Sequence, residues 1–122
     1  MTAVLRALRG ATTLEGDTAE EVTGRVRALV SAMLERNGID HDDLVSILFT
    51  ATDDITSMFP AAAARSLGLG DVPLICAREL AIAGAVPYCV RVLLHFYTER
   101  PRDELHHVYL EGARGLRDDL PD

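Results

Sequence analysis

The sequence contains no lysine. All twelve of its basic residues are arginine, against nineteen acidic residues and a net charge of −7. Schiff-base catalysis and a P-loop both require a lysine amine, so the chain excludes both. Non-specific nucleic-acid binding and polybasic membrane anchoring need dense positive charge, which an acidic chain does not supply. The positive groups that remain are guanidinium forks, which suit carboxylate or phosphate ligands.

Long apolar runs and cysteines are also scarce. The first ten residues carry two arginines and no apolar run followed by small residues, so we expect no signal peptide and a cytoplasmic protein. Arg91 interrupts the longest apolar stretch, which argues against a membrane span. Without a secretion signal, Cys76 and Cys89 are expected to be free thiols.

The 122 residues fit one domain of common size, which buries roughly two-thirds of its unfolded surface. No repeat, low-complexity tract or linker divides the chain. We therefore predict a single domain over residues 1–122, with a mobile C-terminal tail from about 112 to 122.

One long helix is predicted over residues 18–36. Thr18-Ala19-Glu20-Glu21 has the form of a capping box, and Asn37-Gly38 is a typical helix stop. Between them, apolar residues recur at helical spacing from Val22 to Leu34. A short alanine-rich helix is expected within 59–67, beginning near Pro60 and ending at Gly68.

Alternating or β-branched apolar segments predict five strands. The first is expected to end at Gly10. The expected strands span residues 4–10, 44–51, 72–76, 88–98 and 106–110.

These elements predict an α+β fold, in which a mixed five-stranded sheet packs against one long helix and a short one. A single long helix cannot cover both faces of such a sheet. The exposed face therefore needs a partner, which favours an oligomer.

Arg91 is the most informative candidate, because apolar residues flank it within a predicted strand. A charge there is costly unless it is paired or directed at a ligand. The alternatives are an exposed face or a structural ion pair, and spacing alone does not decide between these and a functional role.

Four further candidates have ordinary structural interpretations when each is taken alone. Arg9, at a strand end, and Arg65, after the alanine helix, are typical solvated arginines. Glu79 fits a loop acid paired with Arg78, and Tyr109 a core tyrosine with a satisfied hydroxyl.

Metal, cofactor and nucleophile signatures are absent from the sequence. His106 and His107 are adjacent, so in a strand they point to opposite faces and cannot share a metal. Gly68-Leu69-Gly70 does not match a dinucleotide fingerprint, and no G-x-S-x-G occurs. We expect neither metal nor cofactor.

Five stretches in this order and spacing resemble the AroH-type chorismate mutases, the small monofunctional class. The resemblance runs from Leu5 to about Leu120. The stretches are Arg6–Thr13 (RALRGATT), Phe59–Ala61 (FPA), Val72–Glu79 (VPLICARE), Cys89–Val92 (CVRV) and His107–Glu111 (HVYLE).

The resemblance implies a homotrimeric pseudo-barrel of sheets, with helices outside and active sites in the clefts between subunits. It implies the Claisen rearrangement of chorismate to prephenate, in phenylalanine and tyrosine biosynthesis. That reaction needs no cofactor, covalent intermediate or proton transfer, but it needs a restrained conformer and positive charge at the ether oxygen.

The resemblance also assigns roles by position. Arg91 would donate to the ether oxygen and a carboxylate, Arg9 and Tyr109 would bind carboxylate, and Glu79 would accept from the ring hydroxyl. The remaining matches are Cys76 against the ring, pocket-wall residues Phe59, Ala61, Leu74 and Ile75, Arg65 at the cleft mouth, and tail residues Leu116 and Arg117.

One position departs from the family, which often has a lysine where this chain has Ala62; Arg65 could compensate. Two alternative functions stay open. One is a non-catalytic trimeric module that binds a small carboxylate, although such a module would tolerate loss of Arg91 or Glu79. The other is a different enzyme on a similar trimer, such as a deaminase of reactive imines, which would not need Arg91.

Overall fold

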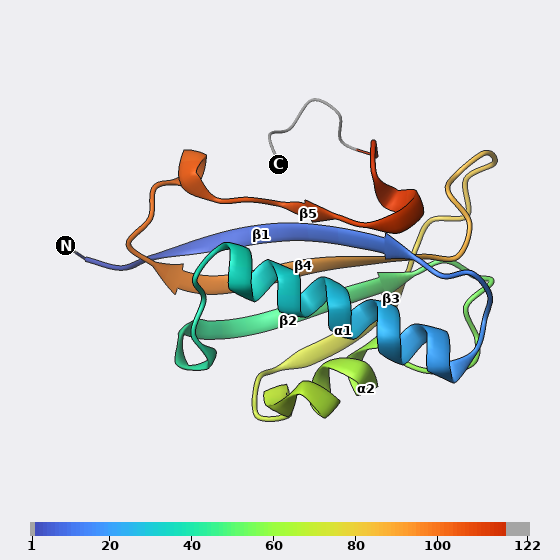
Figure 1. Ribbon diagram of the computed structural model, residues 1–122, viewed down its shortest axis with the longest axis horizontal. Helices are drawn as coiled ribbons and strands as arrows, with labels where there is room; N and C mark the ends of the chain where they lie inside the picture. The colour runs from blue at the N-terminus through green and yellow to red at the C-terminus, as the bar shows by residue number, and fades with distance from the viewer. Residues whose placement is uncertain (1, 117–122) are drawn as a thin grey trace.

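The computed structural model describes residues 2–116, and its centre is a five-stranded sheet in the order β3-β2-β4-β1-β5 (Figure 1). Strand β4 pairs antiparallel with β1 and β2, whereas β3 and β5 join the two edges in parallel. The predicted mixed five-stranded sheet is confirmed. The strands are β1 (Val4–Thr13), β2 (Leu44–Ala51), β3 (Leu74–Arg78), β4 (Cys89–Thr98) and β5 (Val108–Tyr109).

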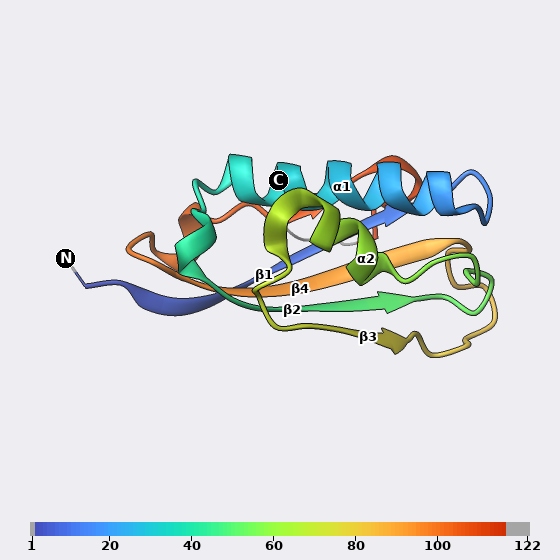
Figure 2. The same ribbon diagram turned by 90° about the horizontal axis from the view of Figure 1, so that it is seen from below.

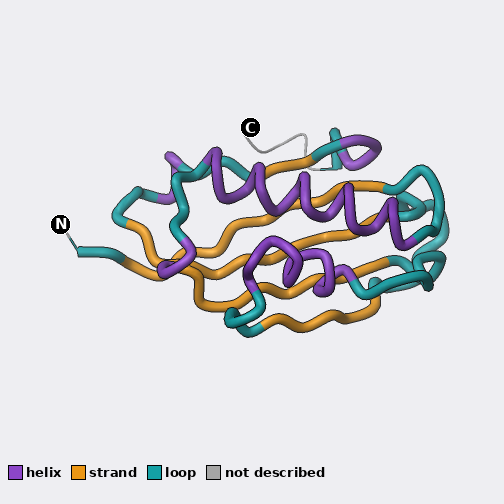
Figure 3. Tube along the Cα trace, turned by 60° about the horizontal axis from the view of Figure 1, so that its bottom comes forward, coloured by secondary structure: helices purple, strands orange, loops and turns teal. Residues whose placement is uncertain are grey.

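Helices α1 (Ala19–Arg36) and α2 (Pro60–Ala64) lie on the same face of the sheet (Figures 2 and 3). Helix α2 belongs to the crossover that carries the chain from β2 to the parallel strand β3, a connection that antiparallel neighbours do not need. Within residues 2–116 no α-helix covers the opposite face, so most of that face lacks the helical cover that the sequence analysis also did not predict for it.

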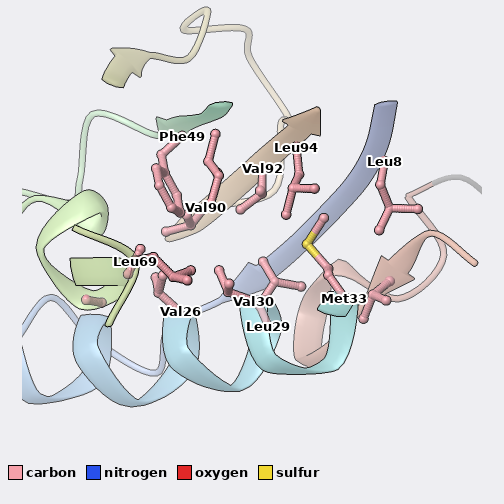
Figure 4. Packing of buried hydrophobic residues seen from close by; sticks show 14 of the residues in the cluster. Leu8, Val26, Leu29, Val30, Met33, Phe49, Leu69, Val90, Val92 and Leu94 are labelled. Carbon is pink, nitrogen blue, oxygen red and sulfur yellow. The ribbon is translucent and has the colours of Figure 1, made fainter. Parts of the chain in front are cut away.

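The apolar stripe of α1 packs on side chains that β1, β2 and β4 direct towards it (Figure 4). The helix begins as predicted, because the Thr18 hydroxyl accepts from the backbone N–H of Glu21 at 3.1 Å. The Glu21 carboxylate, however, accepts from the backbone N–H of Glu15 at 2.7 Å, so the capping box is only half formed. The buried stripe of α1 consists of Val22, Val26, Leu29, Val30 and Met33.

Strand β1 does not end at Gly10 but continues to Thr13, so that prediction was wrong. A Cβ on Gly10 would lie 2.5 Å from the sulfur of Met33 and 3.2 Å from a methyl carbon of Leu29. Gly10 therefore allows β1 and α1 to pack closely and does not form a turn.

The third strand begins at Leu74, two residues later than predicted. Val72 is buried in the core and its N–H bonds to the Leu69 carbonyl at 3.1 Å, which keeps it in the turn after α2. That turn is π-helical over Arg65–Leu69, and Gly68 inside it adopts a left-handed φ of 87°. The short α-helix thus begins at Pro60 as predicted but ends at Ala64, earlier than predicted, because the chain continues from Arg65 as a π-helical turn.

The last strand is only two residues long, shorter than the predicted 106–110. Asn37 takes the place of a strand partner for His106, donating to its carbonyl at 2.9 Å and accepting from its N–H at 2.6 Å. Beyond β5, the N–H of Gly112 donates to the Thr13 hydroxyl at 2.8 Å. The first part of the expected tail is therefore attached to β1.

Candidate active site

The helix-free face of the sheet contains a cavity of about 270 Å³ where four strands bring polar side chains together. Arg9 comes from β1, Arg91 from β4, Tyr109 from β5, and Glu79 directly follows β3. These are the four residues to which the family resemblance assigned the central roles.

The register of the sheet explains why these side chains meet. Arg91 lies opposite Ala11 on one side and opposite Thr50 on the other, and Ala11 in turn lies opposite Tyr109. Side chains of paired residues point to the same face, so this row crosses four strands on the helix-free side. Ala11, which also lines the cavity, separates Arg91 from Tyr109 in this row.

Glu79 and Arg91 form an ion pair, with 2.9 Å between Oε1 and Nε. The backbone N–H of Glu79 donates to the Ala51 carbonyl at 3.0 Å, which holds this residue beside β2. Arg91 Nε is enclosed yet meets hydrogen-bond geometry with no residue in 2–116, so the contact is electrostatic. The ordinary interpretation of Glu79 was an ion pair with Arg78. In the structure Arg78 pairs instead with Asp53, at 3.2 Å.

Cys89, which the sequence analysis treated only as a thiol, lies two residues before Arg91 in β4, on the same face of the sheet. It is buried in a small cluster that also contains Ala11, Ala113, Tyr109 and Leu116. Burial raises the pKa of the Cys89 thiol; the positive charge of Arg91 opposes this, and nearby carboxylates add to it. Leu116 packs against this cluster, as Tyr109 does, and its expected role in closing the site stays a prediction; Arg117 lies outside the described residues.

His107 supports the same site from the edge of the sheet. Its Nδ1 accepts from the backbone N–H of Arg9 at 2.9 Å, one residue before β5 begins. This bond extends the pairing of β1 with β5 and so fixes where Tyr109 lies relative to Arg9. Sequence reasoning placed His107 in a strand and in the HVYLE stretch and asked whether it binds metal, but no local pattern signals this contact.

The other expected site residues lie away from this cavity within one chain. Phe59 and Arg65 are exposed at the two ends of α2, and Ala61 is buried in that helix. Leu74 and Cys76 pack against the core, whereas Ile75 is exposed. Its partner in the register is Leu48, one of the residues that line the cavity.

Strand β3 is an edge strand, and its backbone is available there. Hydrogen bonds from Ile47 N to the Pro73 carbonyl and from Glu79 N to the Ala51 carbonyl direct its odd-numbered residues towards β2. The backbone groups of Leu74 and Cys76 therefore point to the free edge.

No group of three His, Cys, Asp or Glu side chains within residues 2–116 is placed to hold a metal ion. Neither Cys76 nor Cys89 is in a disulfide. No helix in the described part of the chain is both long and apolar enough to cross a membrane.

Known proteins that are similar to this chain identify its family. The family model for chorismate mutase type I matches residues 5–120. The chain is 46% identical over 118 residues to chorismate mutase AroH of Thermus thermophilus, covering 96% of this chain and 97% of that protein. It is 40% identical over 118 residues to chorismate mutase AroH of Bacillus subtilis (strain 168), covering 96% and 93%.

A solved structure agrees with the sequence matches. The chorismate mutase from Clostridium thermocellum superimposes with a TM-score of 0.88 at 40% identity, covering 89% of this chain and 97% of that one. The sequence match spans nearly the whole chain and the fold is shared. The chain therefore belongs to the chorismate mutase type I family.

Proposed function

We propose that this protein rearranges chorismate to prephenate, as a step of aromatic amino-acid biosynthesis, in the cavity that Arg9, Arg91, Glu79 and Tyr109 line. The observation that carries the proposal is the convergence of these four side chains in one cavity of a chorismate mutase family member.

The cavity has the charge that an anionic substrate requires. Arg9 and Arg91 contribute two positive charges and Glu79 one negative charge, a net of +1 in a chain of net charge −7. Local placement of charge, not the total, governs binding in a cleft. Two guanidinium groups and a phenol can hold the two carboxylates of chorismate in the compact shape that the rearrangement needs.

Arg91 is suited to lower the barrier itself. Negative charge develops on the ether oxygen as its C–O bond breaks, so a guanidinium aimed at that oxygen binds the transition state more tightly than the substrate. The ion pair with Glu79 holds the Arg91 side chain before substrate arrives, which reduces reorganisation during the reaction. Glu79 keeps a second carboxylate oxygen that can accept from the substrate's ring hydroxyl.

Three copies of the chain would complete the site. Large apolar side chains are exposed, among them Leu5, Ile75 and Tyr97 on the helix-free face, and such a surface favours association. A neighbouring copy would contribute the exposed side chains of Phe59, Arg65 and Ile75 to the cavity of the first, supported by the inward-packed Ala61 and Leu74. For Cys76, packed inward, the backbone on the edge of β3 is the part available to the substrate.

The test is the decay of chorismate's ultraviolet absorbance with purified protein in the presence of EDTA. We expect decay far above the uncatalysed rate and formation of prephenate. A protein that binds prephenate but leaves chorismate unchanged would instead support the non-catalytic carboxylate-binding module.

A further inference from the structure

Thr50 lines the same cavity, and no role has yet been assigned to it. The residue lies within β2, opposite Arg91 on β4 and opposite Ala77 on β3. It lines the cavity together with Arg91 and Glu79. Its side chain therefore points to the helix-free face, in the row that crosses the site.

The Thr50 hydroxyl oxygen is enclosed and has no hydrogen-bond partner within residues 2–116. An enclosed hydroxyl without a partner destabilises a protein, and a valine would fill the same space in a strand without that cost. Nε of Arg91 is also enclosed at this cavity, but the Glu79 carboxylate lies 2.9 Å from it. The hydroxyl of Thr50 is therefore the enclosed polar group of this cavity that lacks any partner within residues 2–116, as expected if a polar ligand satisfies it.

We propose that Thr50 is a further substrate-binding residue, whose hydroxyl donates a hydrogen bond to an oxygen of the bound dianion beside Arg91. This proposal rests on the proposed function. The hydroxyl is neutral, so it adds a directional contact without changing the charge of the cavity, and it orients the substrate against the Arg91 guanidinium.

Thr12 provides a matched control on the other face of the same sheet. Its hydroxyl oxygen is likewise enclosed and without a partner among the described residues, but Thr12 is fully buried on the side that α1 covers. It does not line the cavity. Removing either hydroxyl should affect the free protein similarly, whereas only the loss at Thr50 should affect substrate.

The experiment compares Thr50→Val, Thr50→Ser and Thr12→Val with the wild type. We measure kcat and KM for chorismate, the Tm of the free protein, and the rise in Tm caused by prephenate. We expect Thr50→Val to lower kcat/KM about three- to tenfold, the loss of one neutral hydrogen bond, mainly through KM. Its Tm should not fall, the prephenate-induced rise should shrink, and Thr50→Ser should restore kcat/KM. Thr12→Val should leave kcat/KM unchanged.

The outcomes separate the two proposals. Wild type that does not turn over chorismate overturns the proposed function and this inference with it. If wild type and Thr50→Val are equally active and equally stabilised by prephenate, only the role of Thr50 is overturned. The role of Thr50 is also overturned if Thr50→Val dissociates the oligomer or lowers Tm while Thr50→Ser restores stability. In that case the hydroxyl forms its hydrogen bond with protein rather than with substrate.

Discussion

Arg91 has apolar neighbours on both sides in the chain, yet its side chain is 42% exposed because alternate residues of β4 face opposite sides of the sheet. Val90 and Val92 point into the core, and Arg91 points into the cavity. Glu79 offsets part of the cost of holding the charge there. From sequence, a structural ion pair and a functional arginine were alternatives; the structure places an ion pair within a cavity.

Replacing Arg91 with alanine should lower kcat about 100- to 1,000-fold, the usual cost of removing a donor that stabilises transition-state charge. Replacement with citrulline, which keeps the shape and removes the charge, should lose nearly as much. The measurement is chorismate turnover at saturating substrate. A citrulline variant with the full rate would show that charge is not the cause.

Arg78→Ala is the matched control for that experiment. Arg78 ends β3, its side chain is 80% exposed, and it pairs with Asp53 outside the cavity. Its loss should change kcat by less than about twofold, because exposed ion pairs contribute little.

Asp17 joins the loop before α1 to the segment before α2. Its carboxylate accepts from the N–H of Thr56 at 2.9 Å, the hydroxyl of Thr56 at 2.7 Å and the N–H of Ser57 at 3.0 Å. The hydrogen bond from the Thr56 hydroxyl contributes most, and together these bonds lower the pKa of Asp17 from 3.8 to about 2.

This pKa predicts a loss of stability in acid. The folded-state pKa is depressed, so the stabilisation is complete above about pH 4 and is lost as the pH falls towards 2. Urea unfolding at pH 5 and at pH 2.5 should show a steeper decline for wild type than for Asp17→Asn. Equal declines in the two proteins would contradict the assignment.

Two glycines, Gly10 in β1 and Gly24 in α1, should respond oppositely to the same substitution. Gly24 is exposed and a Cβ there would meet no atom within 4 Å, so Gly24→Ala should stabilise by up to about 1 kcal/mol. At Gly10 a Cβ meets Met33, so Gly10→Ala should destabilise by about 1–3 kcal/mol. Urea unfolding of both variants measures this, and shifts of the same sign would contradict the packing argument.

One face of the sheet is covered by no α-helix of residues 2–116, and only its end around Ala11 and Cys89 is buried by Ala113 and Leu116. Leu5 is 52% exposed on this face and pairs with Tyr97, several residues along β1 from the cavity. An aspartate at position 5 would place a charge in any interface built on this face without touching the four central side chains. It therefore tests assembly separately from chemistry.

Sedimentation of the wild type should give a trimer, and Leu5→Asp should shift it towards monomer while lowering kcat/KM. Activity of the variant should rise with protein concentration, because association restores complete sites. Ala28→Asp, on the exposed side of α1, is the control and should stay trimeric. A stable monomer with full activity would refute a site shared between subunits.

Elements with strong local patterns were predictable. Helical periodicity alone predicts the helix from the apolar stripe between Val22 and Met33, and composition alone predicts β2 from its apolar run. Both elements lie where they were expected. The predicted strand end at Gly10 was wrong because glycine occurs both in turns and at close contacts between elements. Only the position of Met33 shows that Gly10 is at a close contact. Strand β5 was predicted too long because the Asn37 contact is invisible locally.

Residue identities and spacing were enough to name the family and to single out Arg9, Glu79, Arg91 and Tyr109, because the order of the motifs can be read from the sequence. Their convergence depended on the register of all five strands, including the pairing of β3 with β2 that positions Glu79. Register is set by core packing and hydrogen bonding summed over whole strands, which no short segment encodes. Contacts between different strands are therefore visible only in the folded molecule. They include the ion pair of Glu79 with Arg91 and the positions of Cys89, His107 and Thr50 around it.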